Sequence, residues 1–192
     1  MKHVLVILTI ALTLALCGSA FAQGDNSVYF TTYFANNVAA APDATVRFIN
    51  DGDTGGTLYA DFYVFDDSQE LTECCSCPIT PDGLLSESVR NQLTSTPLTG
   101  IKPTRGVIKV ISDSAGNPYS AAPTPGLRGW ATHIQSAANK NPYGPSPYSQ
   151  TETAVADSNL TAAEQTLLQN LCYYDKLLSG KPCSCTLEDF DF

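Results

Sequence analysis

The cysteines are the residues whose type and spacing could support chemistry in this chain. They fall into two groups of three that lie far apart, and the first group fills three of the four positions in "CCSC". The six residues are Cys74, Cys75, Cys77, Cys172, Cys183 and Cys185. Clustered cysteines can ligate a metal ion, form a redox-active dithiol or pair as structural disulfides. The compartment in which the chain folds decides among these uses.

The N-terminal segment indicates export. A short basic start precedes the apolar run Val4–Leu16, and Ala20–Ala22 has the small-x-small pattern of a cleavage site. We expect residues 1–22 to be a signal peptide and residues 23–192 to reach the extracellular space or the periplasm. No later apolar run has the about 20 residues that a membrane-spanning helix needs. We therefore expect no membrane span in the mature chain.

The charge balance excludes some partners. The chain has 19 acidic and 10 basic residues, which gives a formal net charge of −9. The phosphates of nucleic acids and of anionic lipids would repel such a protein. We therefore expect no nucleic acid partner.

Six cysteines in an exported chain predict three disulfides. Neighbouring cysteines seldom have the separation and torsion that a disulfide needs, so the first group should bond the second. The sequence does not choose among the many connectivities. A redox dithiol is a weaker hypothesis, because Pro78 and a turn follow the C-x-x-C of Cys74 and Cys77 where a helix should begin. A zinc or copper thiolate site is also weaker, because "CSC" is a tighter pair than such sites use. We expect no metal and no cofactor.

Alternating or continuous apolar residues predict five strands. Their ranges are 28–34, 45–50, 57–66, 106–112 and 129–135. In the third, Leu58, Phe62 and Val64 share one face. Between the second and third strands, "DGDTGG" favours a hairpin over 45–66; as a calcium loop it would lack the closing glutamate. Residues 84–93 fit both a strand and a helix, and we favour a strand.

One helix is predicted near the C-terminus, where helix and tail occupy about residues 160–192. Thr161 and Glu164 form a capping box at its start, and Gly180 suits its end. Five apolar residues recur at helical spacing: Leu167, Leu168, Leu171, Tyr174 and Leu178. We expect this stripe to dock on the sheets, with Cys172 beside it holding the helix there.

These elements together predict a mainly β fold. We expect a single domain over residues 23–192, built as an antiparallel two-sheet sandwich of about seven strands with one C-terminal helix, and stapled by disulfides. Two proline-rich stretches, 113–126 and 136–150, show no regular pattern, and we expect loops there.

No residue is assigned a catalytic role. His133 is the only histidine after the signal peptide, and we expect a surface or half-exposed side chain without a partner for acid–base work. Four acids are expected to form a solvated edge: Asp66, Asp67, Glu70 and Glu73. Four aromatic residues are candidates for stacking on a ligand: Trp130, Tyr119, Tyr143 and Tyr148.

The stretch "YVFDDSQELTECCSCPITPDGLLS", taken with "GVIKVIS" and "GWATHIQ", resembles a loosely defined group of secreted proteins from soil bacteria of the acidobacterial type. The similarity would cover most of the mature chain, and the cysteine-dense stretch after "YVFD" is its most specific part. The resemblance implies secretion and a shared fold, and it implies no functional residue.

These features predict a secreted, non-enzymatic structural or adhesive protein of the cell exterior, such as a fibre or surface-layer subunit. Its partners would be further copies of itself or a cell-surface ligand such as a glycan. The strand over 28–34 either joins its own sheet, which we favour, or completes the sheet of a neighbour. The alternative is an extracellular binding module, for a glycan or protein ligand, that uses the loop aromatics.

Overall fold

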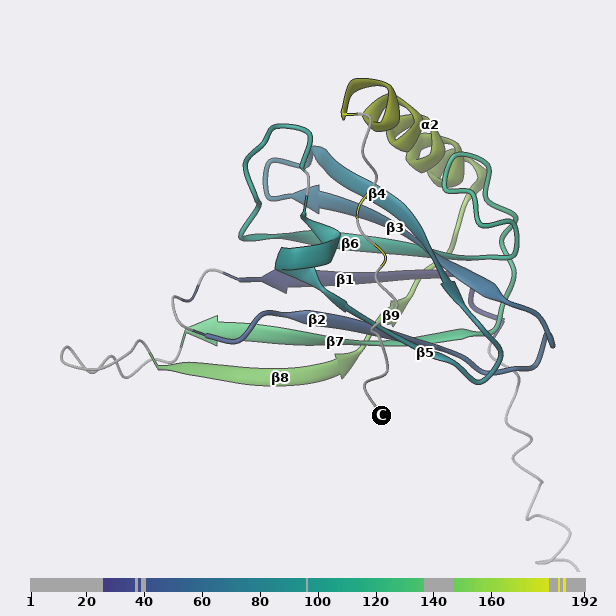
Figure 1. The fold of residues 1–192 in the computed structure, drawn as a ribbon, viewed down its shortest axis with the longest axis horizontal. Coiled ribbons are helices and arrows are strands. Elements are labelled where there is room, and N and C mark those ends of the chain that lie inside the picture. Colours follow the sequence, from purple (N-terminus) through teal and green to yellow (C-terminus); the bar gives the residue numbers. More distant parts are fainter. Residues whose placement is uncertain are drawn as a thin grey trace, which may run out of the picture.

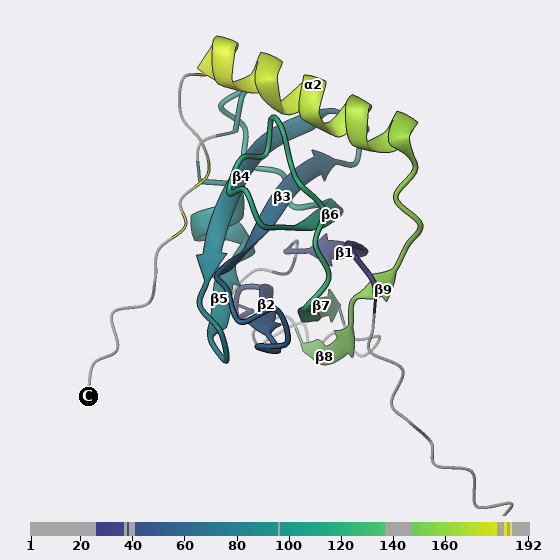
Figure 2. The same cartoon turned by 90° about the vertical axis from the view of Figure 1, so that its right-hand side faces the viewer.

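The computed structural model describes residues 26–36, 38, 41–95, 97–136, 147–179, 183 and 185. In this part of the chain, two antiparallel sheets pack face to face and one helix lies on the outer face of one of them (Figures 1 and 2). The prediction of a mainly β sandwich with a C-terminal helix is confirmed. The predicted signal peptide and Tyr143 lie outside the described residues.

Each sheet is entirely antiparallel. The first has five strands in the order β4-β3-β6-β1-β9, and the second has four in the order β5-β2-β7-β8. The strands of the first are β1 (Tyr29–Ala35), β3 (Leu58–Asp66), β4 (Leu71–Ile79), β6 (Arg105–Asp113) and β9 (Ala156–Asp157). Those of the second are β2 (Thr45–Asn50), β5 (Leu84–Ser88), β7 (Leu127–Ser136) and β8 (Tyr148–Ala154).

The core lies between the two sheets. In β3 the alternation is as predicted, because Leu58 and Phe62 face this core while Tyr63 faces the other side of the sheet. An aromatic row crosses the core: the Phe48 ring lies 5.6 Å from that of Phe30 and 5.9 Å from that of Phe62, both edge to face. Such pairs stabilise a core beyond the area that they bury.

The N-terminal strand belongs to its own sheet. β1 pairs with β6 along its whole length and with β9 through Phe30 and Thr31. Phe30 and Phe34 are buried in the core. The intramolecular placement, which the sequence favours over donation to a neighbour, is the one that the structure has.

The predicted hairpin over residues 45–66 is wrong. β2 and β3 lie in different sheets, so "DGDTGG" carries the chain from one layer to the other. Asn50 holds this corner, because its Nδ2 donates to the Gly56 carbonyl (2.9 Å) and to the Ile79 carbonyl (3.0 Å). The turn residues therefore serve a change of sheet, tied to the end of β4, rather than a two-stranded reversal.

Residues 84–93 contain both of the structures that their pattern fits. β5 ends at Ser88, and a π-helical turn, η1 (Val89–Leu93), follows it. The Ser88 Oγ accepts a hydrogen bond from the Asn91 N–H (3.0 Å) and caps this turn. Val89 and Leu93 are both buried, so their spacing serves the turn while Leu85 serves the strand.

The loop after β6 covers part of the outer face of the five-stranded sheet. The Asp113 carboxylate organises it by accepting hydrogen bonds from the N–H groups of Gly116 (2.6 Å) and Ala122. The Tyr63 hydroxyl donates to the Pro118 carbonyl (2.8 Å). The loop is therefore an ordered cover that is held by side chains of the sheet.

β8 is a strand that the sequence does not predict. All of its residues are exposed, so neither face carries the apolar alternation of a half-buried strand. Among the described residues, β8 pairs with β7 alone.

Candidate interaction surfaces

The geometry of β4 decides how the six cysteines pair. Alternation along the strand turns Cys74 outward, towards the helix α2 (Ala162–Ser179), and turns Cys75 and Cys77 into the core. The disulfides are Cys74–Cys172, Cys75–Cys183 and Cys77–Cys185, with Cα–Cα distances of 5.7, 5.2 and 5.3 Å. The prediction that the first group bonds the second is confirmed.

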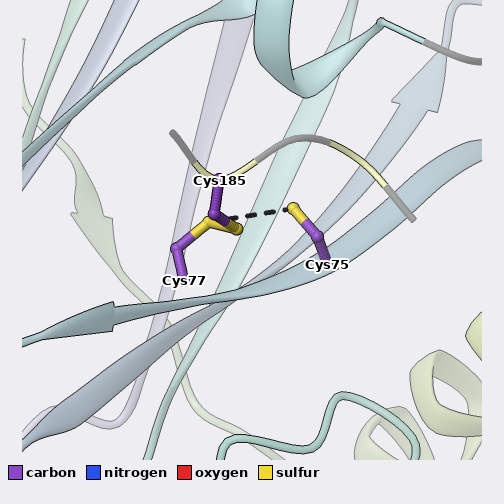
Figure 3. Close-up of side chains that lie close together, drawn as sticks. All are labelled: Cys75, Cys77 and Cys185. Carbon is purple, nitrogen blue, oxygen red and sulfur yellow. Dashed lines mark hydrogen bonds between the residues drawn. A yellow bond between two sulfur atoms is a disulfide. The ribbon is translucent and has the colours of Figure 1, made fainter. Parts of the chain in front are cut away.

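The Cys77–Cys185 disulfide lies beside the sulfur of Cys75, which bonds Cys183 (Figure 3). The Sγ atoms of Cys75, Cys77 and Cys185 lie within 4.8 Å of one another, and that of Cys75 is 3.9 Å from that of Cys77. Cysteine binds metals as the thiolate, but each of these sulfur atoms is already bonded to another sulfur. In its oxidised form the cluster is a covalent staple.

Cys183 and Cys185 lie along the edge of β4. The Cys183 N–H donates to the Cys74 carbonyl at 3.4 Å, and the Cys185 Sγ lies 3.3 Å from the Ser76 carbonyl oxygen. An open edge strand presents backbone groups that invite pairing with another chain. These two disulfide-bonded residues therefore cover part of one edge of the first sheet.

The rotation of α2 about its axis is set by polar and cysteine side chains. Its sheet-facing side carries Glu164, Leu168, Cys172 and Asp175, spaced by four, four and three residues. The Glu164 Oε1 accepts hydrogen bonds from the Tyr29 hydroxyl (2.9 Å) and the Lys109 ammonium (2.6 Å). The predicted cap forms in part, because the Thr161 Oγ1 accepts from the Glu164 N–H (3.1 Å). The Glu164 ion pair and the Cys172 disulfide thus fix the helix at two points.

The predicted helix docks on the sheet and is held there by Cys172, as expected, but most of its apolar stripe does not face the sheet. Leu168 is buried, whereas Leu167 and Leu178 are 50 and 73 % exposed. The stripe of Leu167, Leu171, Tyr174 and Leu178, here called the leucine face, lies roughly a quarter turn round the helix from the sheet-facing side. The apolar pattern identifies a continuous helix face, but the contacts of Glu164 and Cys172 decide which side meets the sheet.

A groove runs beside the leucine face, between α2 and the β3–β4 turn. Its cavity is about 310 Å³. The residues that line it include Leu71, Leu98, Leu171, Tyr174, Asp175 and Leu178. The wall is mostly apolar, so the groove and the leucine face form one continuous hydrophobic surface.

Two buried acids lie close to this groove. Burial raises the pKa of the Asp175 carboxyl to about 6, and the charge of Glu73 acts in the same direction. Glu73 is itself buried, and its Oε1 accepts a hydrogen bond from the Ser95 hydroxyl (3.0 Å). The predicted solvated edge is therefore wrong for Glu73, which lies within β4, whereas Asp67 and Glu70 in the turn before it are exposed.

The candidate stacking residues lie apart. Trp130 is on the outer face of the second sheet, and Tyr148 is at the far end of β8, opposite Ser136. Tyr119 lies on the other side of the sandwich, where the Lys176 ammonium of α2 is 4.7 Å from its ring centre. The structure does not bring these aromatic residues into one site.

His133 is buried rather than half-exposed. It is 2 % exposed, and its ring stacks on that of Tyr33 with 4.0 Å between the ring centres. Its Nε2 lies 2.9 Å from the Thr153 Oγ1. Burial lowers the pKa of the imidazole. The prediction fails because the Tyr33 ring, from the facing sheet, covers this side of β7.

No family model, curated protein or solved structure matches the chain. None of the described helices is long and apolar enough to span a membrane. The leucine face and the sheet surface around Trp130 each combine exposed apolar side chains with an adjoining cavity.

Proposed function

We propose that the mature chain is a secreted, non-enzymatic structural or adhesive protein of the cell exterior, which associates with further copies of itself through α2. The observation that carries this proposal is the exposed leucine face of the helix. Its sheet-facing side holds a salt-bridged acid and a buried carboxyl, while its leucine face meets solvent. Exposed apolar surfaces of this kind commonly mark sites of association.

The spacing of the leucine face suits another helix. Leu167, Leu171, Tyr174 and Leu178 are separated by four, three and four residues, which is the seam that packed helices share. Two copies related by a twofold axis would place this seam against itself. The helix lies on the outside of the sandwich (Figure 2), so a second copy can approach it.

The charge distribution on α2 also supports contact between copies. The whole chain has a net charge of −9, so most of its surface would repel a second copy. The acids Glu164 and Asp175 are on the sheet-facing side of the helix, and Lys176 is directed to the Tyr119 ring. The leucine face therefore offers an uncharged contact on an acidic protein.

The disulfides support both parts of the proposal. Three disulfides are typical of chains that fold outside the cytosol. The Cys74–Cys172 bond joins α2 to β4, so the leucine face is held before any partner arrives. A preformed surface loses less conformational entropy on binding than one that must be ordered.

Sedimentation velocity over a range from low micromolar to near-millimolar protein tests the proposal. We expect wild-type protein to self-associate as concentration rises, and Leu178→Glu to remain monomeric, because Leu178 is 73 % exposed on α2. The matched control is Leu84→Glu, at a leucine that is 59 % exposed on β5 and that should leave association intact. A wild-type monomer at all concentrations, or a Leu178→Glu variant that associates as wild type does, would overturn the proposal.

A further inference from the structure

Trp130 lies on a sheet face that the helix does not cover. α2 packs on the five-stranded sheet, and the outer face of the β5-β2-β7-β8 sheet is on the opposite side of the molecule (Figure 2). In the strand register, Trp130 on β7 is flanked by Arg47 on β2 and by Ala154 on β8. It is 37 % exposed and is the only tryptophan in the chain.

Two arginine–carboxylate pairs border this tryptophan. Arg47 reaches across β7 to Glu152 on β8, with an Nη1–Oε1 distance of 2.5 Å. Arg128 precedes Trp130 by two residues, on the same face of β7, and its Nη2 lies 3.5 Å from the Asp51 Oδ2. The aromatic ring is therefore flanked by two places where a donor and an acceptor are held side by side.

A small cavity adjoins the same residues. It measures about 210 Å³ and is lined by Arg128, Trp130, Ala154 and Asp157, among others. Pockets that enclose drug-sized ligands measure about 300–1,000 Å³. This one would take a single ring at most, so a longer ligand would lie across the sheet face.

The chemistry of these groups fits a carbohydrate. An indole ring offers a broad apolar face with a polar tip, and a pyranose ring has an apolar C–H face. A sugar hydroxyl both donates and accepts hydrogen bonds, whereas guanidinium only donates and carboxylate only accepts. Each arginine–carboxylate pair supplies both roles at once. Because both arginines are already neutralised and the chain is acidic, the face has no excess of positive charge for an anionic ligand.

We infer that this face binds a neutral glycan, with one sugar ring stacked on Trp130 and its hydroxyl groups bonded to the Arg47–Glu152 and Arg128–Asp51 pairs. This inference is independent of association through α2, which lies on the other side of the sandwich. The protein would then have one surface that binds further copies of itself and another that binds a polysaccharide.

The single tryptophan makes the test direct. Intrinsic fluorescence of the wild-type protein is titrated with cellohexaose, chitohexaose and xylohexaose, and retention is measured on cellulose, chitin and xylan. We expect a saturable shift in emission with at least one of these neutral probes, and retention on the matching polysaccharide that persists in high salt. Trp130→Ala should abolish retention, and Arg47→Met should weaken it about tenfold, the scale of one lost hydrogen bond to a charged group.

Tyr173→Ala is the matched control, because it removes an exposed aromatic ring from α2 and should leave retention unchanged. Trp130→Phe keeps a ring at the site and should restore part of the binding, which separates stacking from a folding defect. The inference is overturned if none of the neutral probes shifts the emission, or if Trp130→Ala is retained as wild type is. It is also overturned if only polygalacturonate binds and salt releases it.

Discussion

Asp61 lies in the middle of β3, on the side of the sheet that faces α2 and the loop after β6, and it is completely buried. Burial raises the pKa of its carboxyl to about 8. The neighbouring Ser76 hydroxyl opposes this shift, and the Asp113 carboxylate adds to it. Asp113 is already committed to the N–H groups of the loop, so it cannot move away from a second negative charge. We predict that Asp61→Asn makes the protein more stable at neutral and alkaline pH.

The sign follows from the two states of the carboxyl. In the unfolded chain it ionises near pH 4, whereas in the fold it stays protonated until about pH 8. The folded state therefore binds more protons between these values, and stability falls as pH rises through that range. One proton corresponds to about 1.4 kcal/mol per pH unit, or about 5 kcal/mol over the window at most. Asparagine has nearly the same shape as the protonated aspartate side chain and cannot ionise. The variant therefore lacks the fall in stability with rising pH that Asp61 causes.

The clearest window is pH 6.5–8. Asp175, whose pKa burial raises to about 6, also destabilises the fold as pH rises, but it is present in wild type and in Asp61→Asn, so its contribution cancels in their difference. His133 affects stability below this window. Burial lowers the pKa of its imidazole, so this residue favours the folded state only while its ring is neutral. Urea unfolding of wild type and Asp61→Asn, with disulfides intact, measures the difference. The difference in unfolding free energy between wild type and Asp61→Asn should widen by about 1 kcal/mol per pH unit. The plot of stability against pH for the exposed control Asp53→Asn should stay parallel to that of wild type. Parallel curves for Asp61→Asn would refute the reasoning.

Two further predictions concern the framework. Replacing Cys74 and Cys172 by alanine opens a loop of roughly a dozen residues, because the Cys75–Cys183 disulfide still closes the longer loop. The variant should lose about 3 kcal/mol of unfolding free energy. An unchanged urea midpoint would contradict the assigned pairing. Deleting residues 23–35 removes β1 from between β6 and β9, so the remaining chain should lose its near-ultraviolet circular dichroism, whereas a compact, folded truncate would show that the strand is dispensable.

The strands that the sequence predicts are those whose apolar residues alternate, as in β3, or run almost continuously, as in β6. Leu58 and Phe62 alternate with residues of a different environment, and this contrast is what periodicity detects. β8 escapes because both of its faces are exposed. The sequence does not predict β4, because cysteines fill its central positions. That the side chains of Cys74 and Cys75 point to opposite faces can be inferred only once the strand is known. That alternation separates Cys74 from Cys75 and Cys77 but does not pair the latter two with Cys183 and Cys185, so the sequence could not predict the connectivity.

Side-chain pairs between distant strands set the limit for the candidate surfaces. The sequence singles out Trp130, but nothing in it joins Arg47 to Glu152, because their contact depends on the order of strands in the sheet. The same holds for α2. The residue spacing predicts its apolar stripe, but the rotation of the helix that exposes Leu178 is set by the contacts of Glu164.

The disulfide-bonded tail also fixes the path that mechanical tension would take. Cys77 and Cys185 are joined across a sequence separation of 108 residues, so a force applied to the tail passes straight into β4. The chain between them would extend to roughly 360 Å if it were released, and the bond keeps that length out of reach. If the chain is pulled at its N-terminus and at its C-terminal tail, only β1, β2 and β3 lie between the N-terminus and β4. Under tension the protein would be short and stiff while these disulfides are oxidised, and would become a longer, more compliant chain once they were reduced.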